Sequence, residues 1–282
     1  MPPAEVVLDE ALVRRLLHAQ HPDLAGLPLR HAGAGWDNET WRLGEDLAVR
    51  LPRREAALRC TEAEHAWLGP LATMLPVAVP APVRLGERGE GYPWPWSVVP
   101  WFAGTSAEHA PLGPVAAREL GTMLRALHVP APARAPRNPH RSAPLAARAS
   151  PVPALAHGGG SPAAVRVRIW ERACRAPVPD RRSWVHGDLH ARNLIVARGR
   201  LRAVIDWGDM AGGDPAVDLS VLWTLLDPSE HQAFCSAYGP VEGHLHVRAR
   251  GWALVFGVIF AGLPEDEGAV RIGTRTLERL MR

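Results

Sequence analysis

The fold and the chemistry depend on one stretch, Trp184-Val-His-Gly-Asp-Leu-His-Ala-Arg-Asn-Leu-Ile-Val196, and on the run that follows it, Ala203-Val-Ile-Asp-Trp-Gly-Asp209. Asp188 is followed five residues later by Asn193, and Asp206 ends an apolar, strand-like run. Phosphoryl transfer from a nucleotide needs such a set, because one carboxylate must orient the attacking hydroxyl while two oxygen ligands hold Mg²⁺. Either half of the pattern alone is compatible with an ordinary turn. The two halves together favour kinase chemistry.

With these motifs the chain resembles the aminoglycoside phosphotransferase-like family of small-molecule kinases, which have a protein-kinase-like fold. Six segments carry the resemblance: residues 35–38, 49–54, 92–99, 186–193, 205–209 and 213–219. Residues 129–183 have no confident match. The resemblance implies an ATP-dependent enzyme, with Mg²⁺ as cofactor and GTP not excluded as the nucleotide.

The resemblance also implies roles for individual residues. Asp188 is the expected catalytic base, and Asn193 and Asp206 are the expected magnesium ligands. Asp218 resembles the family's buried acid that braces the catalytic loop, and His186 a residue that packs this loop. His190 is compatible both with a contact to substrate or phosphate and with a solvated loop position.

The first hundred residues contain the expected nucleotide-binding groups. Gly35 lies in Gly33-Ala-Gly35-Trp-Asp-Asn38, where the family has its phosphate-covering loop. Only two glycines are present, so a plain hairpin turn is the alternative. Trp101 falls where the family's hinge meets the adenine, although a role in the core is equally compatible with its sequence position.

The absence of lysine bears on one expected site residue. All 32 basic residues counted as Lys or Arg are arginine. Protein-kinase-like folds hold the nucleotide phosphates with a strand lysine, and here the equivalent strand offers Arg50. Arginine stays charged and binds phosphate bidentately. Glu64 is the expected helix partner of Arg50, with Glu62 as competitor, and a surface ion pair is the alternative.

Hydrophobic patterning predicts an α+β fold of two lobes. We expect a nucleotide-binding lobe with a small antiparallel sheet over residues 1–102, and a larger, mainly helical catalytic and substrate-binding lobe over 103–282. The elements expected are helices over 5–18, 55–72 and 114–127, strands over 39–43, 46–51, 82–86, 96–102, 193–197 and 201–206, and further helices from about 215. Residues 129–162 read as a loop or a poorly packed insert.

Composition excludes several classes of protein. The formal net charge is +3, but residues 128–183 alone carry ten arginines against two acids, and this segment lacks the interleaved aromatics of a nucleic-acid platform. Three widely spaced cysteines indicate neither a zinc site nor a disulfide framework. The longest strongly apolar run, 252–263, is too short to span a bilayer. We therefore expect a cytoplasmic monomer or homodimer that binds neither nucleic acid nor membrane.

The acceptor is less well defined than the reaction. A polycationic aminoglycoside calls for carboxylates, and the acids late in the chain are Asp227, Glu230, Glu242 and the run Glu265-Asp-Glu267. The basic segment 128–183 argues for a less cationic acceptor, such as a macrolide or another hydroxylated metabolite. The alternatives are a primary-metabolite kinase acting on a sugar, choline or homoserine, and a catalytically weak nucleotide-binding pseudokinase.

Overall fold

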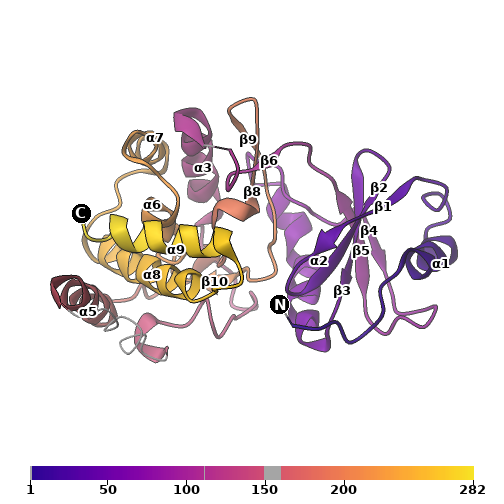
Figure 1. Ribbon diagram of the computed structural model, residues 1–282, viewed down its shortest axis with the longest axis horizontal. Coiled ribbons are helices and arrows are strands. Elements are labelled where there is room, and N and C mark those ends of the chain that lie inside the picture. Colours follow the sequence, from indigo (N-terminus) through magenta and orange to yellow (C-terminus); the bar gives the residue numbers. More distant parts are fainter. Residues whose placement is uncertain (1, 111, 149–159) are drawn as a thin grey trace. The chain divides into compact units, whose positions relative to one another are not determined.

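The computed structural model describes residues 2–110, 112–148 and 160–282. Part of the loop predicted over 129–162 lies outside the described residues. The chain divides into two compact units (Figure 1). The first comprises residues 1–74, 78–103 and 203–208, and the second comprises 75–77, 104–202 and 209–282. The short return of the chain to the first unit at 203–208 carries Asp206.

The first unit is built on a five-stranded antiparallel sheet with the order β1-β2-β3-β5-β4. Its strands are β1 (Leu29–Ala34), β2 (Asn38–Leu43), β3 (Leu47–Pro52), β4 (Arg84–Gly86) and β5 (Trp96–Pro100). Its helical elements are α1 (Glu10–Gln20), the short 3-10 turn η1 (Glu55–Ala57) and α2 (Leu58–Ala72). Strands β2 and β3 form an antiparallel hairpin, and Gly44 takes the positive φ of 62° in its turn.

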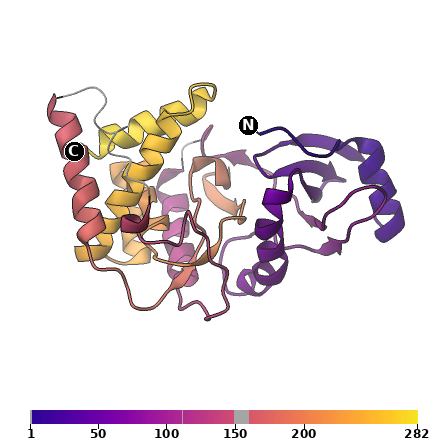
Figure 2. The same cartoon turned by 90° about the horizontal axis from the view of Figure 1, so that it is seen from below.

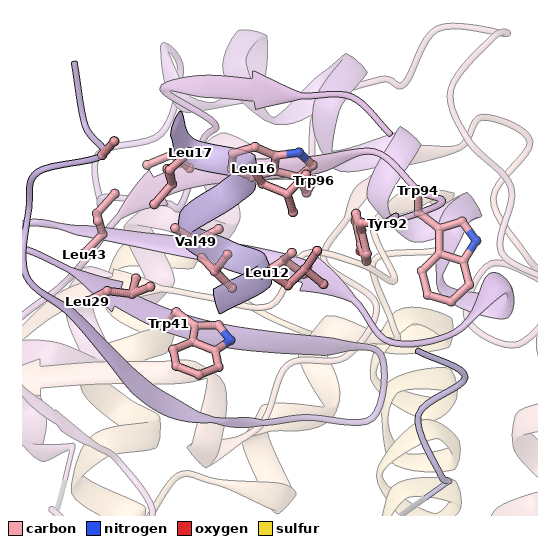
Figure 3. Close-up of a cluster of buried hydrophobic side chains, with 14 residues drawn as sticks. Leu12, Leu16, Leu17, Leu29, Trp41, Leu43, Val49, Tyr92, Trp94 and Trp96 are labelled. Carbon is pink, nitrogen blue, oxygen red and sulfur yellow. The ribbon is translucent and has the colours of Figure 1, made fainter. Parts of the chain in front are cut away.

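Helix α1 covers the sheet with one apolar face. Leu12, Leu16 and Leu17 are buried against the sheet side chains Trp41 and Val49 (Figure 3). The helix begins at Glu10 rather than at the predicted residue 5, because the Asp9 carboxylate accepts a hydrogen bond from the Leu12 N–H at 2.8 Å and caps the first turn.

The second unit is mainly helical. Its helices are α3 (Gly113–Leu127), α5 (Gly160–Arg175), α6 (Val221–Thr224), α7 (Pro228–Tyr238), α8 (Gly243–Ala261) and α9 (Glu267–Arg279). Helix α3 packs on α7, and α8 packs on both α5 and α9. The pair α8 and α9 lies side by side in both views (Figures 1 and 2).

Short strands and 3-10 turns position the catalytic loop in this unit. The strands are β6 (Thr105–Ser106), β7 (Ser183–Val185), β8 (Leu194–Ala197), β9 (Arg200–Val204) and β10 (Ala211–Gly213). The 3-10 turns are η2 (Leu145–Ala147), η3 (Ala191–Asn193) and η4 (Asp218–Ser220). Strand β7 ends directly before His186 and β8 begins directly after Asn193, so the sequence motif is a loop held at both ends. The turn before β9 is Arg198-Gly199, with φ of 52° and 70°.

Candidate active site

Asp218, which is fully buried, holds the backbone of the loop around Asp188. The two carboxylate oxygens of Asp218 accept the backbone N–H groups of His186 and Gly187, each at 2.8 Å. His128 lies 3.1 Å from the same carboxylate. A buried carboxylate with three such partners holds the backbone on which Asp188 stands, which is the arrangement the resemblance implies.

The two residues before Asp188 are fixed by sterics as well as by hydrogen bonds. The fully buried ring of His186 accepts the Asp188 N–H through Nδ1 at 3.3 Å. Gly187 has a φ of 87°, and a Cβ at this position would lie 2.6 Å from the carbonyl oxygen of Asp209. No other residue type fits there without moving the loop. The motif His-Gly-Asp is therefore a structural requirement of the turn.

Asp188 keeps its charge through its neighbours. Its Oδ1 accepts a hydrogen bond from Arg141 Nη2 at 2.9 Å, and its Oδ2 lies 3.3 Å from His190 Nε2. Burial alone would raise the pKa of Asp188, but His190 and Arg141 outweigh that effect and hold the pKa below its ordinary range. Asp188 is therefore a carboxylate at neutral pH, as an acceptor of a hydroxyl proton must be.

His190 is engaged rather than solvated. Its Nδ1 accepts the Arg192 N–H at 3.3 Å, which assigns the proton to Nε2, on the side of Asp188. The ring also stands edge-on to Phe260 at 5.2 Å. His190 thus helps to orient Asp188 and is held in place by the loop itself.

Asn193 offers an oxygen of the kind that Mg²⁺ prefers. The side chain is 5% exposed, and its Nδ2 donates to the Asp188 carbonyl oxygen at 2.9 Å. This hydrogen bond fixes the amide so that Oδ1 remains as a hard ligand atom. Among the described residues no group of three or more His, Cys, Asp or Glu side chains could hold a metal on its own.

The expected nucleotide residues of the first unit form a second cluster. Arg50, on β3, donates through Nη1 to both oxygens of Glu64, on α2, at 3.0 and 2.9 Å. The side chains are 13% and 7% exposed, so this is a largely buried pair and not a surface one. Glu64 is the partner that the sequence favoured, and the competitor Glu62 is exposed. Burial alone would lower the pKa of Arg50, but the charges of Glu64 and Asp206 raise it.

Asp206 belongs to the same unit as Arg50. Its Oδ1 lies 3.8 Å from Arg50 Nη2, and its side chain is 57% exposed. The next residue, Trp207, donates its N–H to Glu64 Oε1 at 3.1 Å. Asp206 has a φ of 62°, which is uncommon and costly for a residue with a side chain. The backbone strain and the Glu64 contact together hold an exposed carboxylate beside the guanidinium of Arg50.

Gly35 and Trp101 have simpler surroundings. The Gly35 N–H closes the β1–β2 hairpin on the Asn38 carbonyl oxygen at 2.8 Å, so this N–H is already used. Two arginines hold the turn: Arg53 donates to the Gly35 carbonyl oxygen, and Arg54 donates to the Asp37 carboxylate. Trp101 is half-buried, and its indole ring carries the Arg42 guanidinium at 5.5 Å.

Two arginines of the second unit, which the sequence patterns did not single out, bind carboxylates in and around the catalytic loop. Arg141 contacts Asp188 and Asp209, and Arg192 makes paired hydrogen bonds with both Glu108 and Asp266 at 2.5 to 2.9 Å. These contacts join residues 47 to 84 positions apart. No periodic pattern or motif spacing marks such pairs.

Several of the acids considered as binding groups for a cationic acceptor already have partners within the protein. Asp227 pairs with Arg275 and Arg279, and buried Glu230 accepts the N–H groups of Gly113 and Asp227. Asp266 is neither an open cation site nor a free turn residue, because Arg192 binds it.

Comparisons with known proteins identify the family and the fold of the chain. The model of the phosphotransferase enzyme family matches residues 28–252. The macrolide 2'-phosphotransferase MphH from Brachybacterium faecium shares the fold at 23% identity, with a TM-score of 0.61 over 96% of this chain and 98% of that one. No curated protein matches the chain in sequence.

Two aminoglycoside phosphotransferases also share the fold. The GDP complex of wild-type aminoglycoside 2'-phosphotransferase-IIIa is 16% identical, with a TM-score of 0.68 over 97% of this chain and 98% of that one. ADP-bound aminoglycoside phosphotransferase APH(2'')-Ib is 17% identical, with a TM-score of 0.61 over 96% and 98%. In the described part of the chain no helix has the length and apolar character needed to cross a membrane. The predicted α+β kinase-like fold is confirmed, and the chain belongs to the phosphotransferase enzyme family as an enzyme of the small-molecule kinase type.

Proposed function

We propose that the protein transfers the γ-phosphoryl group of ATP to a hydroxyl of a small molecule. The observation that carries this proposal is the braced, ionised Asp188 with the amide of Asn193 fixed against its backbone. In the proposed reaction the acceptor oxygen bonds to the γ-phosphorus while the bond to the β–γ bridging oxygen breaks and ADP leaves. Asp188 orients the hydroxyl and takes its proton late, because an alcohol is not ionised at neutral pH.

The remaining site residues have supporting roles in this proposal. Arg50, held by Glu64, binds the nucleotide phosphates in place of the usual lysine. Asn193 and Asp206 supply the oxygen ligands for Mg²⁺, which when bound offsets the negative charge of the phosphates. Two of the neighbours that share the fold were solved with GDP and with ADP, so both ATP and GTP belong in the assay. A nucleoside triphosphate requirement fits the cytoplasm as the place of action.

For the acceptor we propose a neutral or weakly cationic molecule rather than a polycation. The argument is electrostatic. Glu108 and Asp266 are ion-paired with the loop residue Arg192, and their oxygens are taken up by its guanidinium. A polycation gains little from carboxylates that already have a bidentate partner. A macrolide-type hydroxyl compound fits this surface better than an aminoglycoside.

A phosphorylation screen tests the proposal. Purified protein is incubated with Mg²⁺ and ATP or GTP against aminoglycosides, macrolides, sugars, choline and homoserine, and products are detected by mass spectrometry. We expect a macrolide-type product that disappears in Asp188→Asn. A product only with a sugar, choline or homoserine would favour primary metabolism. Nucleotide binding without any product would favour the pseudokinase. Protection of a sensitive host by the expressed chain would assign a role in antibiotic resistance.

A further inference from the structure

The loop over residues 136–142 is fixed by one buried side chain. Asn138 is 1% exposed, and its Nδ2 donates to Asp209 Oδ1 at 2.6 Å. Its Oδ1 accepts the backbone N–H groups of His140 and Arg141 at 2.8 and 3.1 Å. The Ser142 hydroxyl closes the turn on the Asn138 backbone at 2.8 and 2.9 Å. These hydrogen bonds fix the backbone conformation at Arg141 independently of the contacts that its side chain makes.

Arg141 bridges two carboxylates from this loop. Its Nη2 donates to Asp188 Oδ1 at 2.9 Å, and its Nε donates to Asp209 Oδ2 at 3.2 Å. The guanidinium lies over the Phe256 ring at 5.0 Å, and the side chain is 16% exposed. Two nitrogens of one planar group are therefore bound to carboxylates while one of its faces lies on a ring, which a lysine ammonium could not reproduce.

The bridge sets the orientation of the Asp188 carboxylate. Arg141 occupies one lone pair of Oδ1, and His190 lies on the side of Oδ2. A carboxylate offers about four lone-pair positions, so acceptor capacity remains for a hydroxyl. With one neighbour on each oxygen, rotation of the carboxylate about its Cβ–Cγ bond would break at least one contact.

We propose that Arg141 is a positioning residue for phosphoryl transfer, which holds Asp188 through the Asp188–Arg141–Asp209 bridge in the orientation that receives the acceptor hydroxyl. This inference rests on the proposed role of Asp188. It accounts for part of the basic segment 128–183, which contributes a cation to the catalytic loop in a chain without lysine.

The first test separates the chemical step from nucleotide binding. The probe is Mg·ATP in the absence of an acceptor, where water takes the place of the hydroxyl and released phosphate is counted, followed by the acceptor found in the screen. Misplacement of a reacting group by 1 Å can cost about 100-fold in rate. We expect Arg141→Ala and Arg141→Gln to lower kcat by about 10- to 100-fold, with the KM for ATP close to that of the wild type. Arg141→Lys should recover part of the loss, because it restores one of the two contacts.

Arg148→Ala is the matched control. Arg148 follows η2, lies over the Trp252 ring at 5.0 Å and donates to the His140 carbonyl oxygen, and no carboxylate contact is recorded for it among the described residues. Its removal deletes a stacked arginine and its hydrogen bond to the His140 carbonyl oxygen, but neither contact of the Asp188–Arg141–Asp209 bridge. We expect kcat of Arg148→Ala to equal that of the wild type.

A double-mutant cycle identifies the bridge as the cause. Asp209→Ala should lower kcat in the same direction as Arg141→Ala, and the double variant should be no worse than the more affected single variant. Fully additive losses would overturn the bridge. If Arg141→Ala does not fold, as judged by its circular dichroism, Arg141→Gln and Asp209→Ala provide the same comparison.

Asp188→Ala distinguishes failure of the proposed function from failure of the positioning role of Arg141. If Asp188→Ala turns over ATP as the wild type does, or if the wild type turns over no nucleotide with any acceptor, the proposed function fails and this inference fails with it. If Asp188→Ala is inactive while the folded Arg141 variants keep kcat within about two-fold of the wild type, the positioning role alone is wrong. A raised KM for ATP with unchanged kcat would also overturn it.

Discussion

In each of the two units an arginine lies between two carboxylates that include an expected site residue. In the first unit Arg50 lies between Glu64 and Asp206, and in the second Arg141 lies between Asp188 and Asp209. Arg50 stands on a strand and its main partner on a helix 14 residues away, whereas Arg141 stands on a loop and its partners are 47 and 68 residues away. The first arrangement is built from a strand and a helix, and its Arg50–Glu64 pair was expected from the family resemblance. The second is built on a loop and was not expected.

The comparison also separates two tasks. Arg50 contacts Asp206, the exposed carboxylate that we propose as a ligand of Mg²⁺. Arg141 contacts Asp188, the carboxylate that we propose accepts the proton of the acceptor hydroxyl. If this division holds, equivalent substitutions in the two units should change different kinetic parameters.

The largest effect is expected at Asp206. Asp206→Asn keeps the size of the side chain but removes its charge, so it should abolish Mg²⁺-dependent turnover, a loss of about 1,000-fold or more. The fold should be intact, because the side chain is 57% exposed. Turnover is measured as phosphate release against Mg²⁺ concentration, with circular dichroism as control. Activity equal to that of the wild type would refute the ligand assignment.

The next effect is expected at Arg50. Arg50→Ala should raise the KM for ATP by about 10- to 100-fold, because a charge-assisted contact to phosphate is lost. Glu64→Gln should act in the same direction, since Glu64 positions the guanidinium. Glu62→Gln, at an exposed position on the same helix, is the matched control and should have no effect. An unchanged KM in Arg50→Ala would mean that this arginine is only structural.

These two predictions show what the sequence could and could not supply. The Asp188, Asn193 and Asp206 set was proposed from a local motif and the roles that the family resemblance implies for it. The pairing of Arg50 with Glu64 was expected from the resemblance to kinase-like folds, and the structure contains this pair. Arg141 could not be placed, because its position depends on the buried Asn138 amide and on Asp209, far along the chain. The Asn138-Pro139 dipeptide marks a turn, but nothing local says what that turn faces.

A stability effect is expected at Gly268. This glycine lies in the first turn of α9, and a Cβ there would overlap Glu108 Oε1 and crowd Arg192 Nη2. Gly268→Ala should therefore open the ion-pair network and lower the free energy of unfolding by about 1–3 kcal/mol. Gly69→Ala is the control, because nothing lies within 4 Å of a Cβ on this helical glycine. It should stabilise the chain by up to about 1 kcal/mol. Chemical denaturation checks both.

The smallest effect is a pH dependence of stability. Hydrogen bonds from Arg192 lower the pKa of Glu108 and of Asp266 below their ordinary values. The unfolded chain therefore binds more protons than the folded chain in the acidic range, and this part of the stability is present at neutral pH and is lost as the pH falls below about 4. Arg192→Gln should flatten that part of the curve of unfolding free energy against pH. An identical slope in the variant would show that the network is not coupled to acid unfolding.

The central claim is that this chain moves a phosphoryl group to an alcohol by means of Asp188. The most direct test is mass spectrometry of the acceptor panel after incubation with Mg·ATP, with wild type and Asp188→Asn side by side. The account predicts a product heavier by one phosphoryl group with the wild type and none with Asp188→Asn. Equal amounts of product from both proteins would contradict it.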